Sequence, residues 1–254
     1  MRKKVMRNDH THMLDNQLQE LGLVFMQDQY RSHAEQAAKE GVDHVAYLER
    51  LAVGELALRQ DRTVQRRIGQ ARFPVIKTVE QFDWSWPKKI SRLQVQQLFR
   101  FGFAEDKTNV ILLGGVGLGK SHLATALGYA ACQKGMMVMF KTAIDVINGL
   151  EAAHATGRLA QELKKYKNPD ILILDELGYL PLDKRGADLL FQIISQRYEQ
   201  GSLIITTNRA FKQWPEIFNN DSILTSAILD RILHKANVVK IEGPSYRMKD
   251  QVES

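Results

Sequence analysis

The chain has 254 residues, of which 44% are hydrophobic and 25% are charged, and this composition excludes a wholly disordered or fibrous protein. Its net charge of +6 is moderately basic, which favours a nucleic-acid partner only where the charge is clustered. Cys132 is the single cysteine, so no internal disulfide can form. No apolar run of transmembrane length and no secretory signal is found, so we expect a cytoplasmic protein without a membrane partner.

The amino-terminal part of the chain, residues 1–72, is expected to form a small helical domain. Apolar residues recur at the spacing of one helix face between Leu14 and Phe25, and Gly41 predicts a break before a second helix. Pro74 ends the helical pattern, because proline disfavours helix both at its own position and at the preceding one. Residues 73–108 are therefore expected to form a connector.

Residues 109–254 alternate short apolar runs with helical stretches. The strands are expected at NVILLGG, MVMFKT, ILILDE, SLIITTN and NVVKIEG. Helical segments of a dozen or more residues separate the first four runs, a pattern typical of parallel sheets. The predicted fold class is therefore α/β, a parallel sheet with helices on both faces, preceded by the small all-α domain.

One motif predicts a phosphate site. The segment GGVGLGKS has the spacing of glycine, four residues, glycine, lysine and serine, and it lies between an expected strand and an expected helix. Backbone amides and the helix N-terminus are then placed to bind phosphate, Lys120 to bind the β- and γ-phosphates, and Ser121 to bind magnesium. ATP with Mg²⁺ is the predicted ligand. The expected nucleotide-binding residues are Gly114, Gly115, Val116, Gly117, Leu118, Gly119, Lys120, Ser121 and His122.

Two further strands end in polar residues that suit phosphate chemistry. Asp175 lies at the carboxyl end of ILILDE, where open parallel sheets bind ligands, and we expect its carboxylate to bind magnesium. Glu176 follows and is the candidate general base for a water that attacks the γ-phosphate. Asn208 ends LIITTN and is expected to orient that water or to contact the γ-phosphate. A helix cap or a turn is the structural alternative for Asn208.

The order of these motifs resembles that of the AAA+ ATPases. More closely, the chain is similar to the IstB family, the ATP-binding helper proteins of bacterial insertion sequences. The resemblance lies in QARFP (70–74), FDW (82–84), GKSHLA (119–124), LILDELGYLPLD (172–183), ITTNRAFKQW (205–214), AILDRILHKA (227–236) and GPSYRMK (243–249). It implies an AAA+ P-loop ATPase core in residues 109–254.

The resemblance also implies roles for three arginines. Arg231 matches the arginine that reaches the γ-phosphate held by a neighbouring subunit. Arg247 matches the sensor that contacts phosphate within its own subunit, and Arg209 is the second choice for either role. In studied cases an arginine supplied by a neighbour raises the rate of phosphoryl transfer by roughly 10³ to 10⁵. A helix-face ion pair is the structural alternative for Arg231.

A cluster of arginines marks the end of the expected helical domain. Five arginines lie between positions 59 and 72 against one acid, and three of them fall on one helix face, where they would neutralise successive phosphates. A solvated helix face is the alternative. A second candidate region in the core also contains Lys164 and Lys165. Contacts to duplex DNA are expected at Arg59, Arg62, Arg66, Arg67 and Arg72, and in the core at Lys141 and Arg158.

These features predict an ATPase that hydrolyses ATP to ADP and phosphate, stimulated by DNA. We expect it to form homo-oligomers through its ATP sites on double-stranded DNA. The resemblance implies a transposase encoded by the same element as its partner and a role in selecting or remodelling the target site. A replicative helicase loader of the same ATPase class is the closest alternative. A P-loop small-molecule kinase and a DNA-binding scaffold with a silent nucleotide site are the others.

Overall fold

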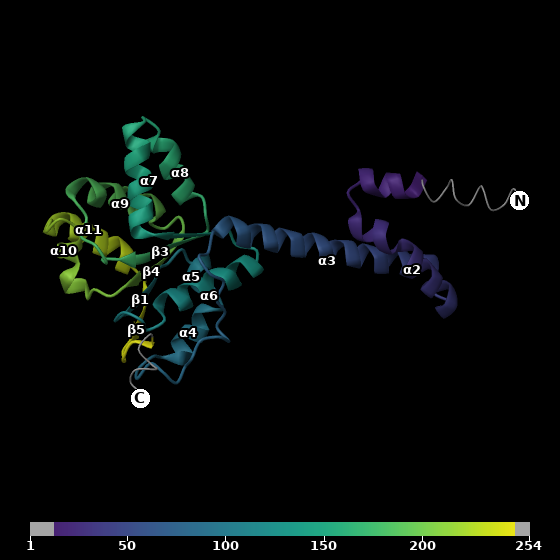
Figure 1. Cartoon of the computed structure of the whole chain (residues 1–254), viewed down its shortest axis with the longest axis horizontal. Helices are drawn as coiled ribbons and strands as arrows, with labels where there is room; N and C mark the ends of the chain where they lie inside the picture. Colours follow the sequence, from purple (N-terminus) through teal and green to yellow (C-terminus); the bar gives the residue numbers. More distant parts are fainter. Residues whose placement is uncertain (1–12, 247–254) are drawn as a thin grey trace, which may run out of the picture. The chain divides into compact units, whose positions relative to one another are not determined.

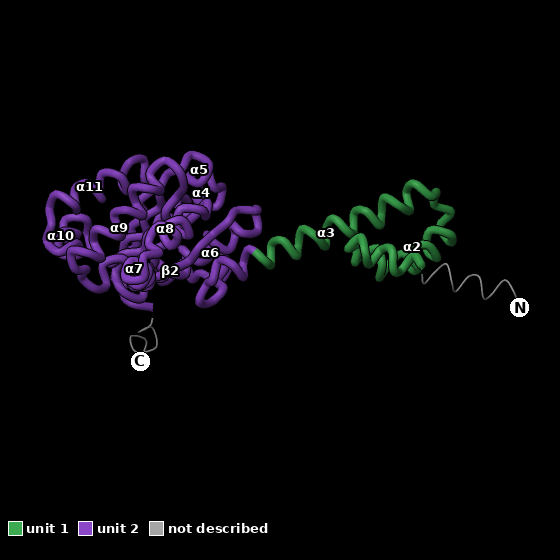
Figure 2. Tube along the Cα trace, turned by 90° about the horizontal axis from the view of Figure 1, so that it is seen from above, with its two compact units in different colours: residues 1–66 green, residues 67–254 purple. Residues whose placement is uncertain are grey.

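The computed structural model describes residues 13–246 and divides the chain into two compact units, Met1–Arg66 and Arg67–Ser254 (Figure 2). The boundary falls within one long helix, α3 (His44–Ala71). In the described part of the first unit, residues 13–20 are helical and α2 (Val24–Glu40) follows. The predicted break at Gly41 is confirmed, since this residue ends α2 with a left-handed φ of 67°.

The first unit is held together by close packing of α2 on α3. The ring of Phe25 lies against Gly54 so closely that a Cβ atom at position 54 would be 2.0 Å from it. Leu51, one turn earlier, is also buried. A glycine inside α3 lowers helix propensity, but here it permits the two helices to approach.

The second unit is built on a five-stranded sheet with the order β2-β3-β4-β1-β5 and parallel pairing throughout (Figure 1). The predicted parallel α/β architecture is therefore confirmed. All five expected strands are present. They are β1 (Val110–Gly114), β2 (Val138–Thr142), β3 (Ile171–Leu177), β4 (Ser202–Thr207) and β5 (Asn237–Ile241).

Helices cover both faces of this sheet. Alternate strand residues, among them Ile111, Leu172 and Leu203, belong to the core cluster shared with the helices of one face. α6 (Lys120–Gln133) packs against β1, β2, β3 and β4. The helices of the core cluster are α7 (Ala143–Ala155), α8 (Leu159–Lys167), α9 (Lys184–Arg197), α10 (Trp214–Ile217) and α11 (Ser222–Leu233). The other elements are α4 (Arg92–Leu98), α5 (Gly102–Glu105), α6 (Lys120–Gln133) and the 3-10 helix η1 (Phe211–Gln213). In the part of the chain that the structure describes, no helix is both long and apolar enough to cross a membrane.

Cys132 lies within α6 and is fully buried. Burial raises the pKa of its thiol to about 11, although the positive charge of Arg67 partly opposes this shift. The thiol is therefore protonated and shielded at neutral pH, as expected for a core residue.

Arg197 fixes the amino-terminal ends of two strands from inside the fold. Its side chain is 1% exposed, and burial lowers its pKa to about 10. The guanidinium donates hydrogen bonds to five backbone carbonyls, those of Tyr166, Lys167, Pro169, Asp170 and Ser202. The Arg197 side chain thus supplies hydrogen-bond donors to backbone carbonyls of the loop before β3 and of the start of β4.

Replacing Arg197 by Met should lower the free energy of unfolding by about 3 kcal/mol, because several buried carbonyls would lose their donors. Urea denaturation measures the change. Arg185→Met, on the exposed side of the same helix, is the matched control and should change stability by less than about 0.5 kcal/mol. Equal stabilities of the Arg197 and Arg185 variants would contradict this role.

Candidate nucleotide and DNA sites

The phosphate loop, the predicted acids Asp175 and Glu176, and Asn208 lie at one edge of the sheet. β4 pairs with both β1 and β3, so the carboxyl ends of these three parallel strands are neighbours. The loop Gly114–Ser121 leaves β1, Asn208 leaves β4, and Asp175 and Glu176 belong to the last part of β3. Open parallel sheets bind their ligands at this edge.

The loop after β1 has the backbone form of a phosphate cradle. Gly117 and Gly119 have φ angles of 74° and 83°, and Gly119 directly precedes α6. A Cβ atom at Gly119 would lie 2.5 Å from the ring of Phe82. Glycine is thus required there both by the backbone and by a neighbouring side chain. The Lys120 ammonium donates a hydrogen bond to the carbonyl of Gly115 at 2.6 Å.

Asp175 is the buried carboxylate of the site, with a relative exposure of 6%. Its Oδ1 accepts hydrogen bonds from the hydroxyls of Ser121, at 2.9 Å, and Thr206, at 2.5 Å. A carboxylate and a hydroxyl in contact are oxygen ligands of the kind that Mg²⁺ takes beside substrate phosphates and water. The described residues contain no cluster of three or more His, Cys, Asp or Glu side chains that could hold a metal ion.

Glu176 is presented by an irregularity of β3. The pairing of β3 with β4 shifts register between Leu174 and Leu177, and Glu176 has a left-handed φ of 59°. Its backbone amide donates to the Thr206 hydroxyl at 2.9 Å. Bulges of this kind redirect side chains beside active sites. The side chain of Glu176 is exposed and lines the cavity next to the loop.

A cavity of about 710 Å³ opens beside this edge of the sheet. Asn208, Glu176 and the loop line one part of it, and residues from two distant segments line the rest. Those from the connector are Lys77, Gln81, Phe82, Asp83, Trp86 and Pro87, and Tyr246 comes from the segment after β5. Tyr179 and the hydroxyl-bearing Thr206 and Thr207 complete the lining.

The connector packs directly onto the phosphate loop. Nε2 of His122 lies 2.8 Å from the carbonyl of Thr78 and donates to it, which fixes the tautomer of the imidazole. The rings of His122 and Phe82 meet edge to face with centroids 5.4 Å apart. His122 therefore joins the first turn of α6 to the connector.

The segment after β5 closes on the loop from another side. The amide of Tyr246 donates to the carbonyl of Gly117 at 2.9 Å. Trp86 donates from Nε1 to the carbonyl of Pro244 at 3.0 Å, and its ring meets that of Tyr246 at 5.7 Å. Residues 78–86, 114–122 and 244–246 thus form one connected wall.

Sequence reasoning missed three parts of this site. Thr206, which binds both Asp175 and the amide of Glu176, stands two residues before Asn208 in LIITTN. Trp86 and Tyr246 stand in segments that sequence analysis treated as a connector and as a sensor motif. The paired hydroxyls of TT and the aromatic residues before Pro87 were the available signals.

Of the three predicted arginines, the two that the structure describes do not line the cavity. The guanidinium of Arg231 lies over the Phe191 ring at 4.9 Å, and its Nη1 donates to the carbonyl of Ala227. Arg209 forms an ion pair with Glu216 at 3.6 Å and does not line the cavity. Arg247 lies outside the described residues.

The end of α11 lies beside the start of β1. The side-chain amide of Asn109 donates to the Ile232 carbonyl at 2.9 Å. The phosphate loop leaves the opposite end of β1. Five strand residues separate the two ends by about 16 Å at ~3.3 Å per residue. Arg231 and the phosphate loop of one chain are therefore at opposite ends of the sheet.

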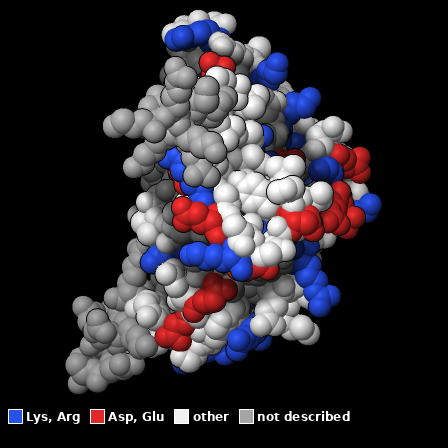
Figure 3. Space-filling model, turned by 90° about the vertical axis from the view of Figure 1, so that its right-hand side faces the viewer, with Lys and Arg blue, Asp and Glu red and all other residues white. Residues whose placement is uncertain are grey.

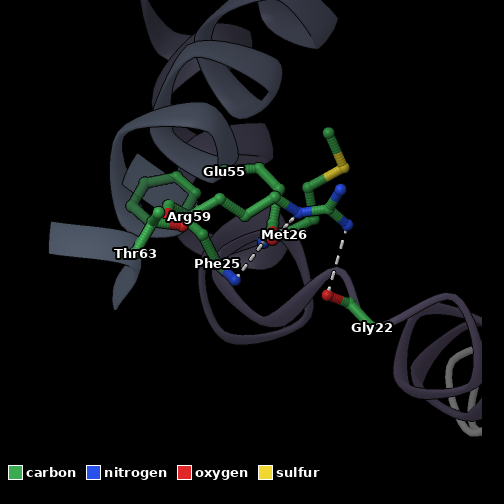
Figure 4. Close-up of polar contacts among 6 residues, drawn as sticks. All are labelled: Gly22, Phe25, Met26, Glu55, Arg59 and Thr63. Atoms are coloured by element: carbon green, nitrogen blue, oxygen red, sulfur yellow. Dashed lines mark hydrogen bonds and ion pairs between the residues drawn. The ribbon is translucent and has the colours of Figure 1, made fainter. Parts of the chain in front are cut away.

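Among the predicted DNA-binding arginines, Arg59 is engaged within the first unit (Figure 4). It forms an ion pair with Glu55 at 3.2 Å and donates to the carbonyl of Gly22. The other carboxylate oxygen of Glu55 accepts the amides of Phe25 and Met26. The side chain of Glu55 therefore helps to join α3 to the start of α2.

The same contacts shift the titration of Glu55. Burial would raise its pKa, but the amide of Met26, the guanidinium of Arg59 and the amide of Phe25 together lower it below its usual value. A lowered pKa means that the contact stabilises the fold at neutral pH and that this contribution is lost as the pH falls through the folded-state pKa.

Two of the remaining arginines meet basic residues of the core. Arg67 and Arg72 line a second cavity, of about 400 Å³, together with Lys141 and Lys165. Met137 and the edge-strand residues Val138 and Met139 also line it, and no described carboxylate does. We call these four cations the basic cleft. It unites Arg67 and Arg72 from the arginine cluster with Lys141 from the core.

The other predicted DNA contacts lie outside this cleft. Arg62 and Arg66 are exposed on α3 in the first unit. Arg158 is exposed just before α8, and its Nε donates to the hydroxyl of Thr156. On the face seen in Figure 3, basic and acidic side chains are interspersed over the described surface. The basic cleft is therefore a better-defined candidate for binding anions than the protein surface as a whole.

The sequence is similar to proteins of one known family. A family model described as IstB-like ATP binding protein matches residues 16–254. The putative ATP-binding protein of insertion sequence IS21 from Pseudomonas aeruginosa is 39% identical over 94% of this chain and 90% of its own length. The corresponding protein of insertion sequence IS5376 from Geobacillus stearothermophilus is 36% identical over 91% of this chain and 92% of its own length.

Solved structures agree at the level of the fold. AMPPCP-bound DnaA from Aquifex aeolicus matches with a TM-score of 0.57 and 22% identity, over 72% of this chain and 55% of that longer chain. The DnaC helicase loader matches with a TM-score of 0.52 and 23% identity, over 64% of this chain and 96% of that one. The predicted AAA+ P-loop fold with a helical amino-terminal region is thus confirmed. The match of the family model and of these relatives over nearly the whole sequence also confirms the predicted resemblance, and the chain belongs to the family of IstB-like ATP binding proteins.

Proposed function

We propose that this chain is an ATP-dependent DNA-binding ATPase that oligomerises on duplex DNA and assists a transposase in insertion-sequence transposition. One observation carries the proposal. The phosphate loop, Asp175, Glu176 and Asn208 share one edge of the sheet, whereas Arg231 lies at the other end. A full set of groups for hydrolysis then requires two copies of the chain.

The nucleotide would bind with its phosphates on the loop. Backbone amides of Gly117–Ser121 and the N-terminus of α6 supply the donors, and Lys120 adds a full positive charge. Ser121 and Asp175 are suited to hold Mg²⁺, which supplies charge that offsets the charge developing on the phosphate oxygens. AMPPCP-bound DnaA shares this fold, which supports a nucleotide in this place.

Hydrolysis would use the residues beside the phosphates. The carboxylate of Glu176 accepts a proton from a water as that water forms a bond to the γ-phosphorus. The bond from the γ-phosphorus to the oxygen bridging it to the β-phosphate breaks, and ADP and phosphate are released. Asn208, which lines the same cavity, orients the water. The amide of Glu176 is held by Thr206, so its side chain starts from a fixed backbone.

Arg231 would complete the site of a neighbouring copy. Its backbone segment is anchored to β1 by Asn109, about 16 Å along the strand from its own phosphate loop. A contact from one end of a subunit to the other end of the next is head-to-tail, which builds rings or filaments. ATP would then lie at the joint between subunits. Arg247 is proposed as the sensor within the same subunit.

Duplex DNA is proposed to lie on the basic cleft and on the exposed arginines of α3. The four cations of the cleft line one concave surface and would contact phosphate oxygens. Arg62 and Arg66 in the first unit are proposed as separate DNA contacts, with Arg158 in the second unit as a further candidate. Arg59 is proposed to contribute mainly to the packing of the first unit, through its ion pair with Glu55. Such contacts give affinity with little sequence preference.

The transposase partner is supported by the relatives, whose names place them in insertion sequences. A helicase loader is the second candidate, because the DnaC helicase loader shares the fold. Co-purification with a hexameric helicase instead of a transposase would favour the loader. Turnover that rises with a small metabolite and ignores DNA would favour a kinase, and the absence of any DNA-stimulated turnover would favour a scaffold.

Mixing two inactive variants tests the shared site. Glu176→Gln should lower turnover about 10²-fold or more while ATP still binds, and Arg231→Ala should lower it about 10³-fold. A 1:1 mixture should recover about a quarter of wild-type turnover, because a quarter of head-to-tail contacts join an intact site to an intact arginine. Steady-state phosphate release measures the recovery.

The control for this mixture is Arg231→Ala combined with the double variant Glu176→Gln/Arg231→Ala. No subunit then carries the arginine, so turnover should stay low. If the first mixture assembles with ATP and DNA yet recovers nothing, Arg231 does not act on a neighbour.

Thr206→Val should raise the Mg²⁺ concentration that supports half-maximal turnover by about tenfold, as expected when a partner of a metal ligand is lost. The reason is that Asp175 would lose one of its two hydroxyl donors and the amide of Glu176 would lose its acceptor. Thr206→Ser keeps the hydroxyl and should restore the wild-type Mg²⁺ dependence. A serine variant as impaired as the valine variant would count against the hydroxyl.

Removing three of the four cations of the basic cleft should flatten the salt dependence of DNA binding. Replacing Arg67, Arg72 and Lys141 by Gln should reduce the slope of log K against log salt by about 0.9 for each DNA phosphate that is no longer neutralised. Fluorescence anisotropy with labelled duplex DNA at several salt concentrations measures it. Arg62→Gln/Arg66→Gln tests α3 separately. The control replaces Lys39, Arg100 and Lys212, three exposed cations elsewhere, and an equal reduction of the slope in that control would remove the cleft from the interface.

A further inference from the structure

The lining of the nucleotide cavity contains two chemically different groups of side chains. Lys120, Ser121, Glu176 and Asn208 suit phosphate and water. A second group is aromatic or cyclic, namely Phe82, Trp86, Pro87, Tyr179 and Tyr246. The volume of the whole cavity, about 710 Å³, lies within the range of ~300–1,000 Å³ found for small-molecule sites. The phosphates alone account only for the polar group.

Three residues of the second group, Trp86, Pro87 and Tyr246, are called the aromatic wall. Trp86 is half-buried, and Tyr246 is 48% exposed. Their rings meet edge to face at 88° with centroids 5.7 Å apart. Both aromatic residues line the cavity.

The aromatic wall is fixed in place relative to the phosphate loop. Nε1 of Trp86 donates to the carbonyl of Pro244, which holds the connector against the segment after β5. The amide of Tyr246 donates to the carbonyl of Gly117 within the loop itself. A ligand with phosphates on the loop would therefore meet a preformed aromatic surface.

We propose that the aromatic wall binds the base of the nucleotide by stacking, with Trp86 and Tyr246 as the residues that distinguish a nucleotide from a bare polyphosphate. This inference rests on the proposed function and names a further part of the same site. Every base has a flat π-face, and its stacking on an aromatic side chain contributes a substantial share of binding. Gln81 and Asp83, which line the cavity beside the wall, supply polar groups near the base edge.

The chain offers a matched control two residues away. Trp84 does not line the cavity. Its ring packs on Phe82 at 4.9 Å, and the guanidinium of Arg92 lies over it. Trp84 packs within the connector, whereas Trp86 lines the cavity. Loss of either indole removes a similar aromatic surface, but only Trp86 is placed to contact a base.

The test compares ATP with inorganic tripolyphosphate, both with Mg²⁺, by calorimetry on the full chain. Trp86→Leu and Tyr246→Leu should each raise the Kd for ATP by about tenfold and leave the Kd for tripolyphosphate unchanged. Trp86→Phe keeps a ring but loses the bond to Pro244, and it should stay within about threefold of wild type. Trp84→Leu should change the two Kd values in parallel.

Tryptophan fluorescence provides a second measurement, directed at Trp86. In the Trp84→Phe variant the remaining tryptophans are Trp86 and Trp214, and Trp214 is fully buried away from the cavity. ATP should change the fluorescence of this variant, and tripolyphosphate should not.

The outcomes separate this inference from the proposed function. If wild type binds neither ATP nor tripolyphosphate, the proposed function fails and this inference fails with it. If wild type binds ATP and the Trp86→Leu and Tyr246→Leu variants bind it equally well, the base lies elsewhere and only this inference is overturned. An equal loss of ATP and tripolyphosphate binding in Trp86→Leu would also overturn it, because Trp86 would then act by supporting the loop.

Discussion

The carboxylate of Asp175 is the point on which the arrangement of the site depends. It is nearly buried, and a buried charge without partners is costly, so its hydroxyl donors determine where it stays. Ser121 ties it to the start of α6, and Thr206 ties it to β4. Since the same threonine hydroxyl accepts the amide of Glu176, the predicted metal ligand and the predicted base are positioned by one shared group. Displacement of β4 would move both.

Much of this edge could be predicted from the sequence, because its chemistry is local. The glycine spacing of the loop and the apolar runs ending in Asp175 and Asn208 each contain their own signal, and parallel pairing brings them together. The part of the cavity lining that comes from the connector and from the segment after β5 could not be predicted, because it depends on the approach of segments that are distant in the sequence. Trp86 and Pro244 are 158 positions apart, and no periodic pattern links them. Thr206 likewise acquires its role only when β4 lies between β1 and β3.

The arginine cluster shows the same limit in another form. Helical spacing predicts that Arg59 and Arg66 share a face of α3, but it does not reveal that a buried carboxylate engages Arg59. Nor does it show that Arg67 and Arg72 belong to the other compact unit, where they meet Lys141 across the edge strand β2. A run of charges in the sequence was therefore divided by the fold into a structural ion pair, an exposed pair and a cleft.

The buried thiol of Cys132 has a practical consequence for measuring assembly. Because burial keeps it protonated, its reaction with maleimide dyes at neutral pH should be slow as long as the fold is intact. A new cysteine on an exposed helix would then be labelled almost alone, without removal of the native one. The chain is thus already suited to placing one fluorophore per copy, from which energy transfer between neighbouring copies would report how they arrange themselves.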